Sequence, residues 1–275
     1  MSEPLILVAL EDPPHARAAL PVAKALSEIM GGSVRVIHVS DHRLPLPELA
    51  ERLGLDRAGL RRWSLETRVG GPSAAIIDAA RATESVKLIL MCTHTAARRP
   101  TAILGHTALD VVRAAPCPVV LVSPTQRFET WWPSRILLAH DGSPAASAAV
   151  APAVNLARKI DAKLIVVQVG TGRGVAPAER GSLMLPLYVD QPQYEWPSWT
   201  DELRDRLASV SPHAEVRPQV RIRGGEPGLE ITQMAIEESV DLIVLAWKGE
   251  WSGEHAKTLK AVLRQAPCPV IIVRA

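Results

Sequence analysis

The sequence has few residues of several kinds, and each shortage excludes a class of protein. Its 275 residues include three cysteines, Cys92, Cys117 and Cys268. So few and scattered cysteines exclude a disulfide framework, and no Cys-x-x-Cys or His/Cys cluster indicates a metal site. Phenylalanine occurs once and tyrosine twice, against seven tryptophans. The core must therefore be built from Val, Ile, Leu and Ala.

An excess of charge and a long apolar run are also missing. The 31 Lys and Arg residues against 29 Asp and Glu give a net charge of +2, which does not indicate a nucleic-acid surface. No stretch of about 18 apolar residues could span a membrane. The N-terminal MSEPLILVALEDPP has an acidic residue before a short apolar run, unlike a signal peptide. We therefore expect a cytoplasmic protein that binds neither nucleic acid nor membrane.

One phrase of the sequence is written twice. VVRAAPCPVVLV at 111–122 aligns with VLRQAPCPVIIV at 262–273, with eight of the twelve positions identical. Four more pairs of segments align in the same order, and they are 6–12 with 136–142, 34–39 with 162–169, 69–76 with 223–231, and 86–92 with 240–246. A chance resemblance would not keep this order, so the chain consists of two copies of one module.

The second copy carries an insertion. The offset between the copies is 130 residues over the first two pairs of segments, about 155 at the Gly-Pro turn, and 151 at the end. About 25 extra residues therefore lie near 170–200, between the second and third strands of that copy. Segments of this length are typical of lids, binding loops or disordered stretches. We expect this one near the carboxyl edge of the second sheet.

Short apolar runs alternate with helical patterns in each copy. LILVAL at 5–10 is continuously apolar, as is typical of a strand buried on both faces. HARAALPVAKALSEIMGG at 15–32 has a helical stripe that ends in Gly-Gly, and PSAAIIDAARATES at 72–85 begins with proline, as helices often do. This alternation predicts an α/β fold, with a parallel sheet and helices on both faces.

Several motifs together resemble the universal stress protein family. They are ILLAHDGS at 136–143, a Gly-x-Pro before a helix, DLIVLAWKG at 241–249, and APCPV at 115–119 and 266–270. The resemblance covers nearly the whole chain, twice, as in a tandem member of the family. It implies two five-stranded parallel-sheet modules of Rossmann-like form and a stress-linked role. It also implies that ATP is bound by some members and not by others.

The resemblance further implies how the two modules associate. Modules of this family pair through the last strand, which lies at the sheet edge, and an exposed edge strand favours a partner. We expect residues 1–126 and 135–275, joined by the linker 127–134, to form an internal pseudo-dimer through their last strands. Further homo-oligomerisation stays open. Cys117 and Cys268 are expected to be small buried residues at the entry to those strands.

Members that bind ATP carry a glycine-rich loop after the fourth strand, by the same resemblance. Its pattern is Gly, two residues, Gly, nine residues, Gly, then Ser or Thr, and an Asp follows the first strand. Glycines let the backbone approach phosphates, and the next helix N-terminus favours anions. In the second copy the corresponding residues are Asp141, Gly142, Ser143, Ala246, Gly249, Ala256 and Lys257. This loop is three residues shorter than the family pattern. Lys257 is either a phosphate ligand or an exposed helix lysine.

The first copy keeps the full loop length but less of the pattern. Its corresponding residues are Glu11, Cys92, Thr95, Gly105, His106 and Thr107. Side chains at Cys92 and Thr95, in place of two glycines, would crowd the phosphate path. Neither copy has a complete site, so ATP is not favoured as a cofactor. If an adenine nucleotide binds, we expect it in the second copy.

Support for an enzyme is weak. The sequence has no Gly-x-Ser-x-Gly elbow and no Walker loop, and GTGRG at 170–174 lacks the third glycine of a dinucleotide fingerprint. The favoured hypothesis is a non-enzymatic stress protein that binds a nucleotide or another small molecule. Two alternatives stay open, which are a scaffold or interaction module without a nucleotide, and a slow ATP hydrolase.

Overall fold

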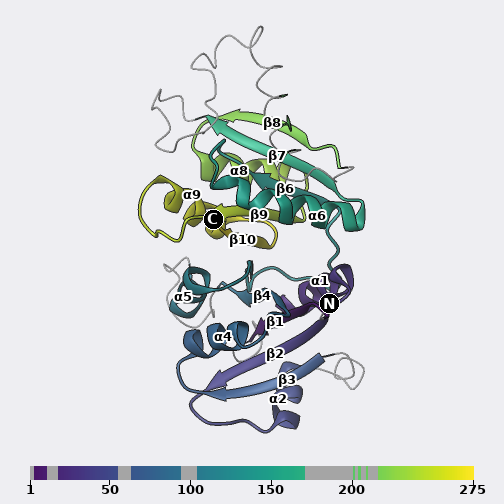
Figure 1. Ribbon diagram of the computed structural model, residues 1–275, viewed down its shortest axis with the longest axis vertical. Helices are drawn as coiled ribbons and strands as arrows, with labels where there is room; N and C mark the ends of the chain where they lie inside the picture. Colours follow the sequence, from purple (N-terminus) through teal and green to yellow (C-terminus); the bar gives the residue numbers. More distant parts are fainter. Residues whose placement is uncertain are drawn as a thin grey trace. The chain divides into compact units, whose positions relative to one another are not determined.

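The computed structural model describes residues 3–10, 18–54, 63–93, 104–170, 201, 204–205, 209 and 216–275. The chain divides into two compact units, Met1–Trp132 and Pro133–Ala275, which Figure 1 colours from purple to teal and from teal to yellow. The insertion predicted near 170–200 falls outside the described residues from position 171 onward. The domain boundaries 1–126 and 135–275 stay a proposal.

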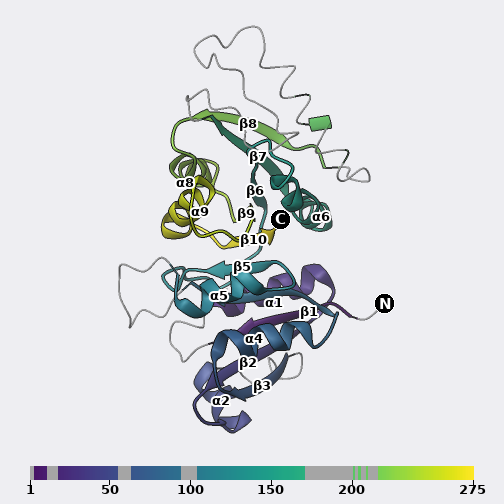
Figure 2. The ribbon, with the colours of Figure 1, turned by 60° about the vertical axis from the view of Figure 1, so that its left-hand side comes forward.

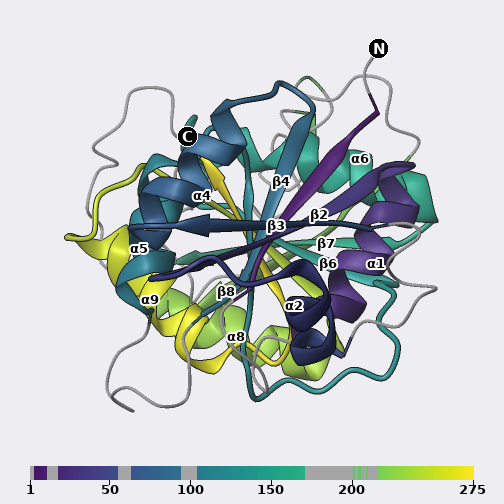
Figure 3. The same ribbon diagram turned by 90° about the horizontal axis from the view of Figure 1, so that it is seen from below.

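The first unit is a five-stranded parallel sheet with helices on both faces. Its strands pair in the order β3-β2-β1-β4-β5, and they are β1 (Leu5–Ala9), β2 (Ser33–Ser40), β3 (Trp63–Val69), β4 (Val86–Cys92) and β5 (Val119–Val122). Its helices are α1 (Ala19–Met30), α2 (Leu46–Leu53), α4 (Pro72–Arg81) and α5 (His106–Ala114). Helices α1 and α2 cover one face of the sheet, and α4 and α5 cover the other (Figure 3).

The second unit repeats this architecture. Its strands pair in the order β10-β9-β6-β7-β8, and they are β6 (Arg135–Ala139), β7 (Lys163–Gly170), β8 (Gln219–Gly224), β9 (Leu242–Trp247) and β10 (Val270–Arg274). Its helices are the 3₁₀ helix η2 (Ala146–Ala149), α6 (Val150–Ile160), α8 (Pro227–Glu237) and α9 (Glu254–Gln265). Helix α6 covers one face, and α8 and α9 pack together on the other (Figure 2).

The predicted α/β class, with two five-stranded parallel modules, is confirmed. Every residue of β1 is buried, as expected of a continuous apolar run at the centre of a sheet. Helix α1 ends at Gly31, whose φ of 64° is left-handed and therefore suits glycine. Helix α4 begins at Pro72, at the predicted position. Local signals in the sequence thus predicted the end of α1 and the start of α4.

Two buried polar side chains occupy matching positions in the two units. His38 of β2 and Gln168 of β7 are each only 3% exposed. A ring nitrogen of His38 lies 3.0 Å from the carbonyl oxygen of Leu10, and the Gln168 amide donates to the carbonyl of Asp141 at 3.4 Å. Each side chain therefore ties the second strand of its unit to the backbone just beyond the first strand. In the second unit this contact holds Asp141 in place.

The carboxyl end of β6 is a topological switch point. Strand β7 pairs with one edge of β6 and β9 with the other, so the order of the strands reverses there. Helices leave the ends of these strands on opposite faces, which opens a crevice between them. Ligands of open α/β sheets bind in this crevice. The fold thus places the turn Asp141–Ser143 at the position where a ligand is expected.

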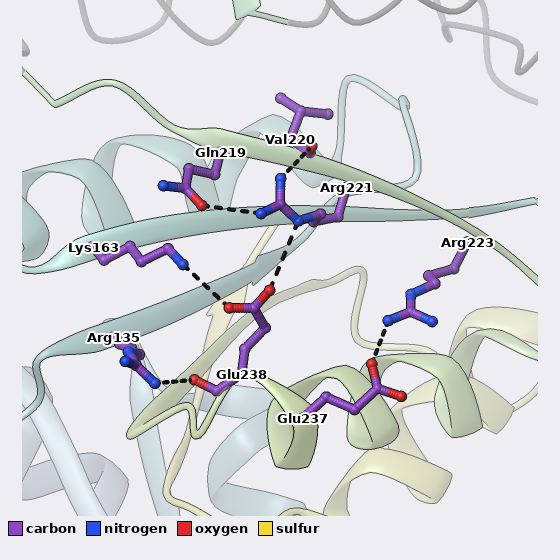
Figure 4. Close-up of polar contacts among 8 residues, drawn as sticks. All are labelled: Arg135, Lys163, Gln219, Val220, Arg221, Arg223, Glu237 and Glu238. Atoms are coloured by element: carbon purple, nitrogen blue, oxygen red, sulfur yellow. Dashed lines mark hydrogen bonds and ion pairs between the residues drawn. The ribbon is translucent and has the colours of Figure 1, made fainter.

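The opposite, amino end of the second sheet is held by a charged cluster around Glu238 (Figure 4). The Glu238 carboxylate accepts a hydrogen bond from Lys163 Nζ at 3.2 Å and lies 3.8 Å from Arg221 Nε. Arg135 donates to the main-chain carbonyl of Glu238 at 2.7 Å, and the neighbouring Glu237 pairs with Arg223 from nearer the carboxyl end of β8. The hydrogen bond from Lys163 and the nearby positive charges hold the pKa of Glu238 below its ordinary value.

Replacing Glu238 with glutamine is expected to lower the free energy of unfolding by about 0.5–1 kcal/mol near neutral pH, because the ion pairs are partly exposed. The lowered pKa makes this contribution complete above the unfolded glutamate pKa of about 4.3. It is lost as the pH falls through the folded pKa. Urea denaturation of both proteins at neutral and acidic pH measures it, and a difference that grows on acidification would contradict the account.

The internal pseudo-dimer, in which the last strands of the two modules pair, stays a prediction from the sequence. If it is correct, residues 1–126 expressed alone lose the partner of their last strand. We then expect this piece to self-associate or to be insoluble, because its apolar edge strand is unpaired. Sedimentation velocity of the piece beside the full chain tests this. A monodisperse monomer of residues 1–126 would argue against the predicted pairing.

Candidate functional site

A pocket of about 240 Å³ lies in the second unit, at the carboxyl ends of its strands. Ala139 at the end of β6 and the next residues His140 and Asp141 line it, together with Val167 and Val169 of β7 and Leu245 to Trp247 of β9. The other lining residues come from the helices and loops around the crevice, and they are Ser143, Ala145, Ala146, Pro227, Ile231, Lys248, Glu254, His255, Thr258, Leu259 and Ala275. The walls are therefore mostly apolar, with polar groups from the turn after β6 and from the start of α9.

Asp141 stands at the mouth of this pocket in a structured turn. Its Oδ1 accepts a hydrogen bond from the backbone N–H of Ser143 at 2.9 Å, and Ser143 Oγ accepts from the N–H of Ala146 at 3.1 Å. Gly142, between them, has a φ of 82°, a conformation that suits glycine. The Asp-Gly-Ser sequence therefore folds into a turn that fixes the direction of the carboxylate.

A second wall of the pocket approaches Asp141 from α9. His255 Nδ1 lies 3.5 Å from Asp141 Oδ2, and both side chains are exposed at the pocket mouth. Because Oδ1 serves the turn, Oδ2 is the oxygen that faces the opposite wall. The carboxylate can thus accept a hydrogen bond from a ligand or from the histidine.

His140 is fixed in a form that cannot act as a base toward the nearest hydroxyl. Its Nδ1 accepts a hydrogen bond from the backbone N–H of Gly142 at 3.0 Å, so in the neutral ring the proton is on Nε2. Nε2 lies 3.5 Å from Ser147 Oγ, and the ring therefore donates to that oxygen. A base would instead have to accept the hydroxyl proton. This pair does not supply an activated serine.

The loop after β9 is held by its own tryptophans. Trp247 is 2% exposed, and its indole N–H donates to the carbonyl oxygen of Glu250 at 3.0 Å. The Trp251 ring meets Trp247 edge to face, with 5.7 Å between ring centroids. Lys260 Nζ lies 4.9 Å from the centroid of Trp251 and donates to its carbonyl oxygen at 2.9 Å. The loop is therefore shaped by internal contacts.

The structure brings together part of the residue set predicted for the second copy. Asp141, Ser143 and Ala246 line the pocket, and Gly142 lies within the same turn. Gly249, Ala256 and Lys257 are not among the lining residues. Gly249 has a φ of 90° with open space beside it, Ala256 is buried in α9, and Lys257 hydrogen-bonds to Glu254 on the helix surface.

Sequence reasoning did not select Trp247, Glu254, His255 or Thr258 as site residues, although all line the pocket. The family pattern predicted Lys257 at this position instead. The signal in the sequence is Gly253, which is the N-cap of α9 and belongs to a residue type accepted at that position. A helix that begins at Glu254 points its first two turns at the pocket.

In the first copy the structure places some of the predicted residues and leaves others outside the described part. Cys92 ends β4 and is half-buried, whereas Glu11 and Thr95 lie outside the described residues. Gly105 is the N-cap of α5, and its N–H donates to the carbonyl of Thr93 at 2.9 Å. His106 and Thr107 form the first turn of that helix. The role of these residues in binding stays a prediction.

All three cysteines are free thiols, and Cys117 and Cys268 lie in settings that suppress reactivity. Burial raises the pKa of the Cys117 thiol to about 11, and it raises the pKa of Cys268 further. The prediction of a buried residue is confirmed for Cys268, and Cys117 is half-buried. Among the described residues no group of three or more His, Cys, Asp or Glu side chains could hold a metal ion. None of the described helices is long and apolar enough to cross a membrane.

Comparison with known families agrees with the repeat and the fold. The profile of the universal stress protein family matches residues 46–123 and 133–274, one segment in each unit. The chain belongs to the universal stress protein family. The two matched segments support the tandem organisation inferred from the repeated APCPV phrases.

Relatives of this universal stress protein match about half of it. A universal stress protein of Thermus aquaticus is 32% identical over 136 residues, which are 42% of this chain and 96% of that protein. The Bacillus subtilis universal stress protein YxiE is 29% identical over 147 residues, 51% of this chain and 99% of that protein. Each relative thus has the length of one module.

A solved structure has the length of both modules. The universal stress protein from Archaeoglobus fulgidus aligns over 98% of each chain with a TM-score of 0.66, at 16% sequence identity. At this identity the match shows the fold alone. It is the two-module α/β fold described above.

Proposed function

We propose that this universal stress protein acts by binding a small molecule in the pocket of its second module, and that the molecule contains adenosine. The observation that carries the proposal is the position of Asp141 at the mouth of a pocket at the switch point of the sheet. A carboxylate there can accept hydrogen bonds from ligand hydroxyl or amino groups. The apolar side chains of Val167, Val169 and Leu245 offer walls for a planar ring.

Binding without catalysis is the form of this function that the site chemistry supports. The tautomer of His140 directs its proton toward Ser147, so the pair lacks the base that a nucleophilic serine needs. Lys257, which a phosphate-transfer site could use, is not among the residues that line the pocket. These contacts disfavour the slow ATP hydrolase among the alternatives.

A test begins with the protein as purified. Denaturing it and separating the released small molecules by chromatography would detect a bound adenine compound, and calorimetric titration with ATP and with adenosine would then measure affinity. We expect saturable binding of at least one of these at one site per chain. Absence of release together with absence of saturable binding would contradict the proposal.

The second candidate function is a scaffold or interaction module that binds no nucleotide. Its support is the incomplete loop, in which Gly249 and Lys257 do not reach the pocket lining. Under this alternative the two degenerate sites are vestigial. The same titration separates the candidates, because a scaffold binds neither ATP nor adenosine.

A further inference from the structure

The geometry of the second module points to an uncharged ligand of nucleoside size, and we infer that its pocket favours a nucleoside over a nucleoside triphosphate. The inference rests on the proposed function, since it names the class of ligand for the same pocket. Three features carry it, and they are the size of the pocket, the loop that follows β9, and the charges at the rim.

The size of the pocket limits the ligand. Its volume of about 240 Å³ lies below the range of about 300–1,000 Å³ that is typical of pockets for drug-sized molecules. Its apolar walls come from both sides of the crevice, with Val167 and Val169 from β7 and Ile231 and Leu259 from the two helices. Such a space suits a planar base with its sugar at the mouth, and a chain of three phosphates would then have to lie outside it, along the rim.

The loop after β9 is short, so it offers few backbone N–H groups that could bind a phosphate chain. It spans only 248–253 in the second unit, whereas the first unit has 93–105 between β4 and α5. By the repeat offset of 151 residues, Lys257 corresponds to His106, the first residue of α5. Helix α9 begins at Glu254, one turn earlier. The second unit therefore has an additional helical turn and a shorter loop than the first unit at this point of the chain.

This additional turn places a carboxylate at the rim. Glu254 lines the pocket from the first position of α9, where a phosphate would otherwise meet free N–H groups of the helix. A carboxylate at this position satisfies the positive end of the helix dipole itself. It also repels the negative charge of a phosphate at close range.

The charged groups that line the pocket do not offset this repulsion. Asp141 and Glu254 contribute two carboxylates, against one lysine, Lys248, and His255. Outside the lining, Lys257 Nζ bonds to Glu254 in an ion pair whose two side chains are exposed, so solvent weakens its attraction, and Lys260 Nζ donates to the carbonyl of Trp251. An uncharged ligand avoids the repulsion and still offers hydroxyl donors to Asp141.

The experiment is a set of calorimetric titrations of the full chain with adenosine, AMP and ATP at one ionic strength. We expect adenosine to bind at least about tenfold more tightly than ATP, with AMP between them. Replacing Glu254 with glutamine is expected to narrow the adenosine-to-ATP ratio by about two- to fivefold, because one rim charge is removed. Glu237→Gln is the matched control, a carboxylate of the same module at the far end of α8, and it should leave the ratio unchanged.

The outcomes separate this inference from the proposed function. If ATP binds as tightly as adenosine or more tightly, the inference is wrong and the proposed function stands. If Glu254→Gln leaves the ratio where it is in the wild type, the rim charge does not select the ligand, and the inference is also wrong. If neither adenosine nor ATP binds, both the inference and the proposed function are wrong.

Discussion

Replacing Trp247 with alanine is expected to lower the free energy of unfolding of the second module by about 3–5 kcal/mol, the usual loss for a buried tryptophan. Trp247 is 2% exposed and forms the edge-to-face contact with Trp251. Its indole N–H donates to the carbonyl of Glu250, and its own carbonyl accepts from the N–H of Ala275. Removing the indole would leave a cavity beneath the loop that borders the pocket.

The matched control is Trp132→Ala. Trp132 has the same side chain but is 52% exposed, so its replacement should change the stability by no more than about 0.5 kcal/mol. Urea denaturation followed by circular dichroism measures both variants beside the wild type. Equal stability of the two variants would show that the contacts of Trp247 do not hold the loop.

Replacing Asp141 with alanine is expected to weaken ligand binding by about 10- to 100-fold. The reason is the loss of a charge-assisted hydrogen bond, which contributes about 1.5–3 kcal/mol when its acceptor is ionised. The change also removes the acceptor for the N–H of Ser143, so the turn after β6 becomes less well fixed. Calorimetric titration with adenosine and with ATP measures the effect.

The control for Asp141→Ala is Gly105→Val in the first module. Gly105 has a φ of −64° and a ψ of 154°, an extended conformation that valine adopts readily, so this change tests the helix N-terminus without backbone strain. We expect wild-type affinity in this variant. Loss of binding in Gly105→Val and not in Asp141→Ala would move the site to the first module.

The fold was largely readable from local patterns, with informative exceptions. The buried run of β1, the glycine that ends α1 and the proline that begins α4 each act within a few residues, and the sequence predicted those elements. Helix α2 was missed, because its eight residues are too short for a clear helical period. Strand β3 was not located, because in WSLETRV only one residue is fully buried and the alternation is weak.

The sequence predicted residues of the candidate site correctly only where they lie at the ends of strands. The Asp-Gly-Ser turn follows β6 directly, so its place at the carboxyl edge of a parallel sheet followed from the strand alone. The placement of Lys257 depended instead on where α9 begins, and loop length did not determine that. Because the helix starts at Glu254, Glu254 and Thr258 line the pocket and Lys257 does not. The family pattern, which assumes the longer loop, could not reveal this.

The most direct test of the central claim, ligand binding in the pocket of the second module, is the indole N–H signal of Trp247 during titration with adenosine. A nitrogen–proton correlation spectrum of the full chain resolves the seven tryptophans, and Trp247→Phe identifies the signal. Since Trp247 lines the pocket and Trp63 lies in β3 of the first module, their signals report on different modules. The account predicts a saturable shift of the Trp247 signal, with the Trp63 signal unmoved. A Trp247 signal that stays in place at saturating adenosine would contradict it.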